Sequence, residues 1–126
     1  MSQQEALERI ETAAWEGSTE LDLSDLGLTA LPPEIGQLTQ LTELDTKRNK
    51  LTSLPPEIGR LIQLIDLNAR DNQLTELPPE IGRLTQLTRL NVGDNPLISP
   101  PPEIVEQGVE AILAYLRDLG AGETPN

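Results

Sequence analysis

Residues 77–86 read LPPEIGRLTQ, and almost the same phrase occurs twice earlier in the chain. LPPEIGRLIQ begins at Leu54 and LPPEIGQLTQ at Leu31, so each copy begins 23 residues after the one before it. A phrase that recurs at a fixed interval of this length is typical of proteins that stack one supersecondary unit on the next. The repeat therefore decides the architecture of this chain.

Each 23-residue unit opens with a short alternation of polar and apolar residues, as in TELDLS at residues 19–24. A period of two predicts a short, half-buried β-strand. Aligned from Ser18, Leu41, Leu64 and Leu87, the units share three apolar columns, which are Leu21, Leu44, Leu67 and Leu90; Leu28, Leu51, Leu74 and Leu97; and Ile35, Ile58, Ile81 and Ile104. We expect all three columns to face one shared core.

The LPPEIG phrase predicts a different local structure. Its two prolines fix an extended segment, and the second proline can open a short helical turn. Gly36, Gly59 and Gly82 stand where that turn is expected to end. A single unit cannot bury its own apolar side, so we expect the units to stack with their strands parallel and about 4.8 Å apart.

The full pattern, LxxLxLxxNxLxxLPxEIGxLxx, resembles the 23-residue intracellular form of the leucine-rich repeat. It is carried by LTELDTKRNKLTSLPPEIGRLIQ, LIDLNARDNQLTELPPEIGRLTQ and LTRLNVGDNPLISPPPEIVEQ, and by a less regular first copy, STELDLSDLGLTALPPEIGQLTQ. The resemblance covers residues 18–108. It implies an α/β fold, a short leucine-rich repeat solenoid with a concave parallel sheet and four repeats, and a role in binding protein.

The first unit and the segment before it also resemble the leucine-rich domains of bacterial Roco-type signalling proteins. In that family the repeats often precede a GTPase module. No GxxxxGK[S/T] phosphate loop occurs in these 126 residues, so the chain is not itself the GTPase.

A stack of this kind needs a cap at each end. Residues 1–17 are predicted to form an N-terminal capping helix, with Trp15 packed over the first unit or, alternatively, stacking on a ligand. Residues 109–120 are predicted to form a C-terminal capping helix that ends at Gly120 or, alternatively, an amphipathic helix that binds a partner. Four repeats fill residues 18–108, and residues 121–126 are expected to form a disordered tail.

The ninth position of the units carries Asn49, Asn72 and Asn95. We predict that these side chains turn inward and bond backbone groups that a tight bend leaves unpaired. The alternative is a polar ladder for recognition. Leu26 holds this position in the first unit, so that unit is expected to bend differently.

The composition argues against catalysis and against several classes of partner. Histidine and cysteine are both absent, which removes the usual general base, the usual nucleophile machinery and thiolate metal sites. The net charge of −12 argues against binding nucleic acid or an anionic membrane. We therefore expect no enzyme activity, no cofactor and no metal. The acidic N-terminus does not resemble a signal peptide, so the chain is expected to be a cytoplasmic monomer.

The candidate binding surface consists of the third, fifth, seventh and eighth positions of each unit, which are expected to point outward from the strands. In the second to fourth units the candidate residues are Glu43, Asp45, Lys47, Arg48, Asp66, Asn68, Arg70, Asp71, Arg89 and Asn91. This surface lacks aromatic residues, which argues against sugar recognition by stacking.

Seven of the nine basic residues lie between positions 47 and 89, so the surface is predicted to have a basic centre between acidic ends. Lys47 and Arg70 share one column, a like-charge arrangement that costs some stability and is tolerated at functional sites. The alternative is that Asp45, Asp66 and Asp71 neutralise the basic residues locally.

These observations predict a non-catalytic protein–protein interaction module that binds an acidic or mixed-charge protein on its concave strand face. One alternative is a sensory or regulatory leucine-rich segment of a Roco-like GTPase signalling protein. Another is a scaffold that associates with itself.

Overall fold

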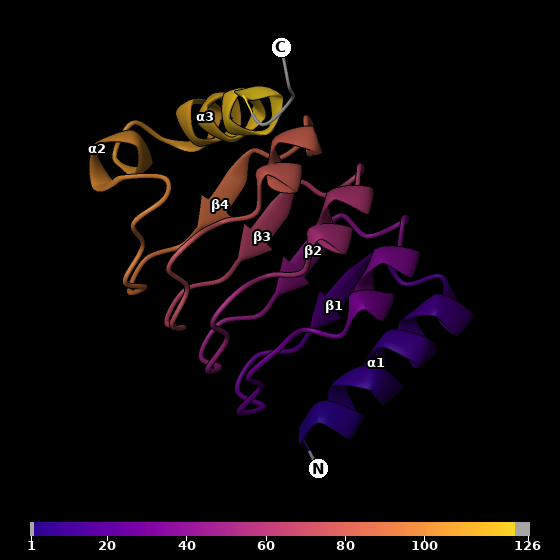
Figure 1. Ribbon diagram of the computed structural model, residues 1–126. Helices are drawn as coiled ribbons and strands as arrows, with labels where there is room; N and C mark the ends of the chain where they lie inside the picture. Colours follow the sequence, from indigo (N-terminus) through magenta and orange to yellow (C-terminus); the bar gives the residue numbers. More distant parts are fainter. Residues whose placement is uncertain (1, 123–126) are drawn as a thin grey trace.

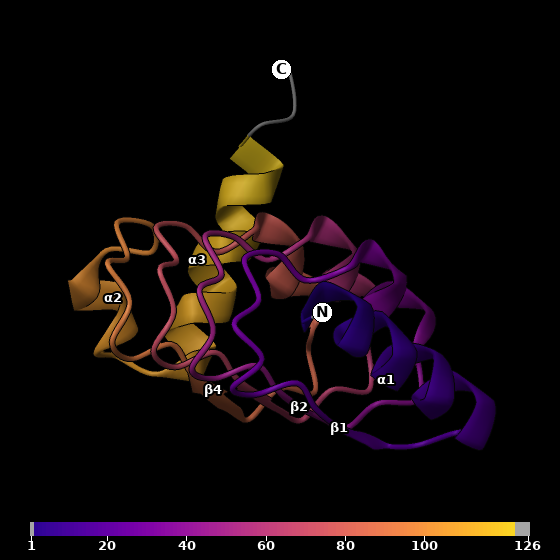
Figure 2. The ribbon, with the colours of Figure 1, turned by 90° about the horizontal axis from the view of Figure 1, so that it is seen from below.

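The structure is a computed structural model that describes residues 2–122. Its strands are β1 (Glu20–Asp22), β2 (Glu43–Asp45), β3 (Asp66–Asn68) and β4 (Arg89–Asn91). Its helices are α1 (Ser2–Glu16), the short 3₁₀ helices η1 (Pro33–Gln37), η2 (Pro56–Arg60) and η3 (Pro79–Arg83), and α2 (Pro102–Val105) and α3 (Val109–Gly122). The strands lie side by side in chain order, the 3₁₀ helices form a second layer, and α1 and α3 lie at the two ends (Figures 1 and 2). The predicted short solenoid is confirmed.

All neighbouring strands pair in parallel, and each strand residue lies opposite the equivalent residue of the next unit. Leu44 of β2 lies opposite Leu21 on one side and Leu67 on the other, and Leu67 lies opposite Leu90. Because the register equals the repeat length, every column of the sequence becomes a straight row across the sheet. The rows carry the core on one face and the candidate residues on the other.

The core is a column of leucine and isoleucine between the strand layer and the 3₁₀ layer. Leu28, Leu51 and Leu74 are buried, and so are the isoleucines at the centres of η1, η2 and η3. Leu21, Leu90 and Leu97, which belong to the first and last units, are only partly buried. The strand row is therefore most completely covered in its middle, at Leu44 and Leu67, where both neighbours are repeats.

The sequence predicted that the glycines of the LPPEIG phrases end the turns, but in the structure they also have a packing role. Gly59 lies inside η2, and a Cβ atom there would come within 2.8 Å of both the Cβ and the carbonyl oxygen of Glu80 in η3. The equivalent atom on Gly36 would lie 3.0 Å from the Cβ of Glu57. These glycines are small because successive 3₁₀ helices pass close to one another.

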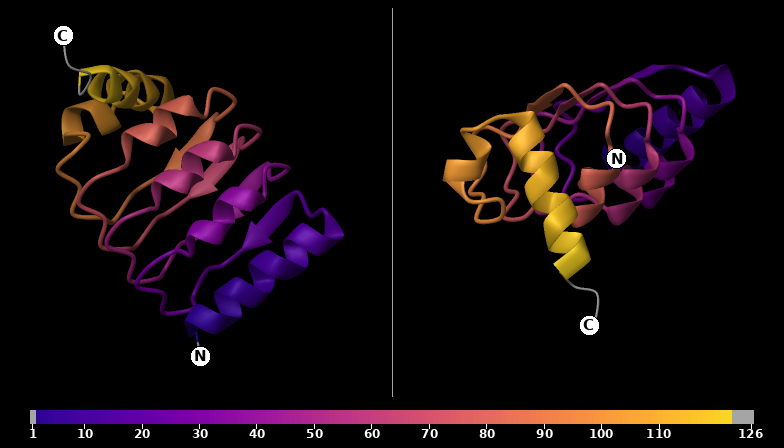
Figure 3. Two further views of the ribbon diagram at one scale, coloured as in Figure 1. Left: turned by 45° about the vertical axis from the view of Figure 1, so that its right-hand side comes forward. Right: turned by 90° about the horizontal axis from the view of Figure 1, so that it is seen from above.

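The fourth unit leaves the stack after its bend. The phrase PEIV forms α2, which buries none of its residues, and Ile104 is only partly covered although it continues a buried column. Helix α3 takes the vacant place against η3, where a Cβ on Gly82 would lie 2.9 Å from the backbone nitrogen of Arg117 (Figure 3). Helix α3 buries Ile112, Leu113 and Leu116, whereas α2 buries none of its residues.

The helix ends differ slightly from the expected bounds. Gly17 follows α1 with a φ of 65°, as expected of a residue that ends a helix. Helix α3 continues through Gly120 to Gly122, so the predicted stop at Gly120 is wrong. A Cβ on Gly120 would lie 3.4 Å from Pro79, which places this glycine at a close packing contact instead. Of the predicted tail, residues 121–122 are helical and 123–126 lie outside the described residues.

The prediction that Trp15 packs over the first unit is wrong. Trp15 is 90% exposed, whereas Ala6, Ile10 and Ala13 of the same helix are buried. At 100° per residue, Trp15 lies on the side of α1 opposite these three residues, so it cannot reach the core. Among residues 2–122 no helix combines the length and the apolar character that crossing a membrane requires.

Candidate binding face

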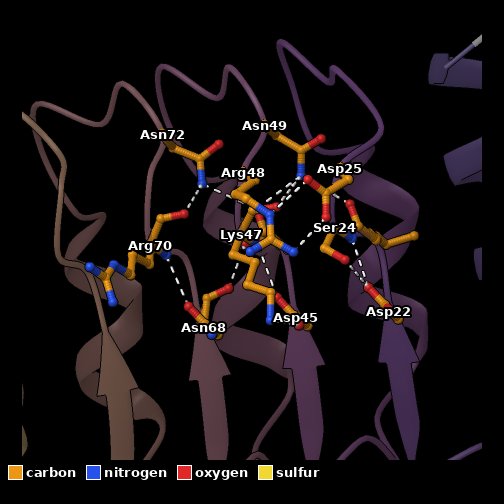
Figure 4. A network of polar contacts seen from close by, with 12 residues as sticks. Asp22, Ser24, Asp25, Asp45, Lys47, Arg48, Asn49, Asn68, Arg70 and Asn72 are labelled. Carbon is orange, nitrogen blue, oxygen red and sulfur yellow. Dashed lines mark hydrogen bonds and ion pairs between the residues drawn. The ribbon is translucent and has the colours of Figure 1, made fainter.

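The outward side of the strands and of the bends that follow them, opposite the core, is here called the strand face. Figure 4 shows Asp45, Lys47, Arg48, Asn68 and Arg70 of the candidate residues on this side. Glu43, Asp45, Asp66, Asn68, Arg89 and Asn91 stand on β2, β3 and β4, and Lys47, Arg48, Arg70 and Asp71 stand in the bends. Over β1, β2 and β3 this face is hollowed to a volume of about 380 Å³, lined mainly by acidic side chains.

The fifth position of every unit closes the end of its strand. The Oδ1 of Asp22 accepts a hydrogen bond from the backbone N–H of Ser24 at 2.8 Å, and Asp45 accepts one from Lys47 at 3.0 Å. Asn68 and Asn91 accept the equivalent bonds at 3.1 and 3.0 Å. Sequence reasoning treated these residues only as outward polar groups. The signal for their second role was a column containing nothing but Asp and Asn, the residues that form this kind of turn.

The eighth position adopts the left-handed backbone conformation in all four units. Asp25, Asp71 and Asp94 have φ between 54° and 59°, a region that aspartate tolerates. Arg48 has φ of 55° and lacks the short polar side chain that eases this conformation. Its guanidinium makes a two-pronged contact with Asp25, through bonds of 2.7 and 2.8 Å to the two carboxylate oxygens.

The asparagine column turns inward and bonds the backbone, as predicted. Asn49 is 8% exposed, and its Nδ2 donates to the carbonyl oxygens of Leu23 and Thr46, each at 2.9 Å. Its Oδ1 accepts from the backbone N–H groups of Leu26 and Leu28 at 3.0 Å. Each asparagine therefore ties its own unit to the one before it, and Asn72 and Asn95 repeat the pattern.

The first unit bends differently, as the leucine at its ninth position predicted. Gly27 has a φ of 66°, which adds a second left-handed residue to that bend beside Asp25. The bond from the backbone N–H of Leu26 to Asn49 is also particular to this unit, because the later asparagines accept only the bond from the eleventh position. Asn49 of the second unit therefore makes one more backbone hydrogen bond to the bend before it than Asn72 or Asn95 makes.

The basic residues of the strand face are each paired with an aspartate. Arg70 Nε lies 2.8 Å from Asp94, Lys47 Nζ lies 3.3 Å from Asp45, and Arg89 lies 3.6 Å from Asp66. With the Arg48–Asp25 pair, this arrangement favours local neutralisation over an unpaired basic centre. Asp45 and Asp66 take part as expected, while Asp71 belongs to none of the pairs.

The acidic residues of the strand face differ in how their charge is balanced. Hydrogen bonds from the hydroxyl and the backbone N–H of Ser24 lower the pKa of Asp22, and the bond from Arg48 lowers the pKa of Asp25. Glu43 lies beside Glu20 in the neighbouring strand, and its pKa is raised by a hydrogen bond to that carboxyl group and by repulsion from it. Among the described residues neither Glu20 nor Glu43 takes part in an ion pair, so the hollow holds acidic charge that has no direct basic partner.

Residues 2–122 contain no group of histidine, cysteine or carboxylate side chains that could hold a metal ion. The shifted carboxylates of the strand face, Asp22, Asp25 and Glu43, have little or no burial. An open and charged surface of this kind is suited to recognition rather than to the water-excluding chemistry of an active site.

Comparison with known proteins gives a consistent picture. A family model described as a leucine-rich repeat region matches residues 20–119. The solved structure of the leucine-rich repeat protein LIC12759 of Leptospira interrogans is 38% identical, with a TM-score of 0.60 over 74% of this chain and 28% of that one. YopM from Yersinia enterocolitica WA-314 is 26% identical, with a TM-score of 0.52 over 75% of this chain and 24% of that one. The chain thus spans about a quarter of the length of each. No curated protein matches it.

Proposed function

This chain belongs to the leucine-rich repeat family, and from that premise we propose that it is a non-catalytic module that binds a protein partner on its strand face. The observation that supports this proposal is the construction of that face. Its outward side chains stand in straight rows, and the aspartates and asparagines of the fifth position are fixed by the backbone. Side chains that are already ordered lose less entropy on binding, which favours affinity.

The ion pairs favour a partner of mixed charge. Solvent-exposed pairs contribute at most about 1 kcal/mol each to stability. Their larger effect here is to fix the directions of charged groups, since Arg48 and Arg70 each hold an aspartate of a neighbouring unit. A partner with acidic groups near Arg89, which is 77% exposed, and basic groups near Glu20 and Glu43 would complement the face.

The test compares two charge reversals of equal size. The native chain, a Lys47→Glu/Arg70→Glu variant and an Arg60→Glu/Arg83→Glu variant are used as baits in cytosolic lysate at graded salt concentrations. Arg60 and Arg83 end η2 and η3, on the layer opposite the strands, so the second variant controls for net charge. We expect a specific band to be lost only with the first variant, after melting curves confirm that all three chains fold. Equal capture by all three would count against the strand face as the binding site.

A second candidate function rests on the sequence resemblance to Roco-type proteins. In this hypothesis the repeats are the sensory or regulatory segment of a GTPase signalling protein. The hypothesis predicts a GxxxxGK[S/T] loop in the same coding region, and sequencing that region tests it. The cytoplasmic setting and the monomeric state likewise remain predictions from the sequence, and mass in solution at several concentrations tests the second.

A further inference from the structure

The outer side of α1 carries the most exposed large apolar side chain of the described residues. Trp15 is 90% exposed, and it is the only tryptophan in the chain. Helix α1 packs on β1 and η1 through its other side. It lies at one end of the stack, with no other element of residues 2–122 on its outer side (Figures 1 and 3). A tryptophan exposed to this degree contributes little to the fold, so its value to the protein is better sought in binding.

Trp15 continues a straight stripe along the helix. Gln4, Glu8, Glu11 and Trp15 are spaced by four, three and four residues, the spacing that places side chains on one helix face. All four are exposed, and they lie opposite the buried Ala6 and Ile10. We call these four residues the Trp15 stripe.

The charge on this stripe is not balanced within the described residues. Glu8 and Glu11 form no ion pair, and like charges three positions apart slightly destabilise a helix. Arg9 is the only basic residue of α1, and its guanidinium is already occupied. It pairs with Glu5 at 2.7 Å and donates a bond of 2.8 Å to the carbonyl oxygen of Asp22 in β1. The helix therefore has no cation left for the outer carboxylates.

We propose that the Trp15 stripe is a second interaction surface, which docks a basic helical segment of a partner protein. Arginine side chains spaced by four residues on that segment pair with Glu8 and Glu11, and a guanidinium or aliphatic group covers the ring of Trp15. The choice of occupant rests on charge complementarity, since the stripe is acidic and a guanidinium both pairs with carboxylates and stacks on tryptophan. Tryptophan is also the side chain most often found to dominate binding at interfaces.

This surface lies at the end of the stack and shares no residue with the strand face. Its partner segment is therefore distinct from whatever the strand face binds, and each proposal can fail without the other. The acidic stripe repels phosphate, so neither a nucleic acid nor an anionic bilayer fits it.

The test uses Trp15 itself as the reporter. The probe is a short synthetic amphipathic helix with arginines four residues apart on one face and leucines beside them. Two control peptides are a scrambled isomer and a version with glutamate in place of arginine. On adding the arginine peptide we expect the emission of Trp15 to shift to shorter wavelength as the ring leaves water. Neither control peptide should produce this shift.

Affinities are then measured by the anisotropy of labelled peptide, which also reads variants without tryptophan. Trp15→Ala should weaken binding roughly 30-fold or more, as the loss of a dominant interface residue does. Glu8→Gln/Glu11→Gln should weaken it by roughly tenfold at low salt and flatten its salt dependence. Ile98→Ala, which trims a side chain 73% exposed in the fourth unit, and the Lys47→Glu/Arg70→Glu variant should leave the affinity unchanged.

Several outcomes would overturn the proposal. They are equal affinity for Trp15→Ala and the native chain, equal binding of the scrambled peptide, and no binding of the arginine peptide. An increase of mass in light scattering that Trp15→Ala abolishes would show that the stripe serves a second copy of this chain instead. Because Trp15, Glu8 and Glu11 are exposed, melting curves should show all variants folded, so loss of binding cannot be ascribed to unfolding.

Discussion

At the scale of single residues, the side chains of the strand face serve the fold and the surface at once. Asp45 closes the end of β2 by accepting a bond from the backbone N–H of Lys47, and its other oxygen pairs with the amine of the same lysine. Arg48 adopts a left-handed backbone conformation that is unfavourable for arginine, and its guanidinium donates a hydrogen bond to Asp25 of the neighbouring unit. Asp45 and Arg48 are therefore poor targets for a test of binding alone, because replacing either also alters local structure.

Glu43 gives the clearest prediction at this scale. Its pKa is raised by Glu20, so the folded state holds its proton more tightly than the unfolded state does. The folded state is favoured by this pair below the unfolded pKa, and that advantage is lost as pH rises through the folded pKa. Glu43→Gln should therefore raise the melting temperature at neutral pH, and the gain should disappear in acid, where the carboxyl group of Glu43 is protonated. Calorimetric melts across the pH range measure this.

Glu20→Gln should give the same profile, because removing either carboxylate relieves the repulsion. Glu76→Gln, an exposed change at an isolated β-bridge to Ser99 and away from the hollow, provides the control for net charge. A gain for Glu43→Gln that is equal at all pH values would show that the repulsion from Glu20 is not its cause.

At the scale of elements, the 3₁₀ helices stack because a glycine lies at each contact. Gly59→Ala places a methyl group 2.8 Å from the backbone oxygen of Glu80, closer than the atoms can tolerate. We expect it to lower the free energy of unfolding by about 1–3 kcal/mol, the usual cost of overpacking. Denaturant titration measures the loss.

Gly36→Ala is the matched comparison, since its methyl group meets the equivalent atoms of Glu57 at 3.0 and 3.1 Å. It should cost less than Gly59→Ala because the neighbouring helix needs to move less. If the two variants lost the same stability, the closeness of the contact between neighbouring 3₁₀ helices would not be what sets the cost.

Elements were also where sequence reasoning was most and least reliable. The strands, their register and the inward asparagines follow from columns that recur every 23 residues. The strand pattern occurs in four units and the asparagine in three, so several units support each prediction. The exit of α2 from the stack was not predictable in this way, because the fourth phrase, PPPEIVEQ, still looks like a repeat. Its fate depends on α3, which competes for the same contact with η3 and buries more apolar surface.

The candidate site divides along the same line. The residues that would face outward could be read from the alternation within each unit, and Figure 4 shows Asp45, Lys47, Arg48, Asn68 and Arg70 on one side. The ion pairs of Arg48 and Arg70 could not be read in this way, because Asp25 and Asp94 lie in other units and reach these arginines only once the bends are formed. Trp15 was misplaced for a related reason, since a lone aromatic residue in a helix gives no repeated column against which to check its orientation.

At the scale of the whole molecule, the fold depends on its ends. The core is a single column of apolar side chains that runs along the stack. Helix α3 covers the C-terminal end of this column through Leu116, which is fully buried against the last 3₁₀ layer. Leu116→Ala should lower the free energy of unfolding by about 2–5 kcal/mol, as large-to-small changes in cores do. The melting curve should keep a single transition, because four units leave too little core for a part of the stack to persist alone.

Hydrogen exchange distinguishes cooperative unfolding of the whole stack from local unfolding at its C-terminal end. If unfolding is cooperative, Leu116→Ala should reduce the protection of amides in β1 as well as in β4. Loss of protection confined to β4 and α3 would show that the units near α1 are stable without the C-terminal end.

The asparagine bonds also bear on how such a gene can grow. Each asparagine bonds backbone groups in the bend of the unit before it. A unit therefore supplies an asparagine to the unit before it and receives one from the unit after it. A copying error that duplicates one 23-codon stretch in frame would insert a unit already fitted to both neighbours. Such duplications lengthen the sheet during evolution and leave both terminal helices unchanged. Selection then acts on the new surface alone.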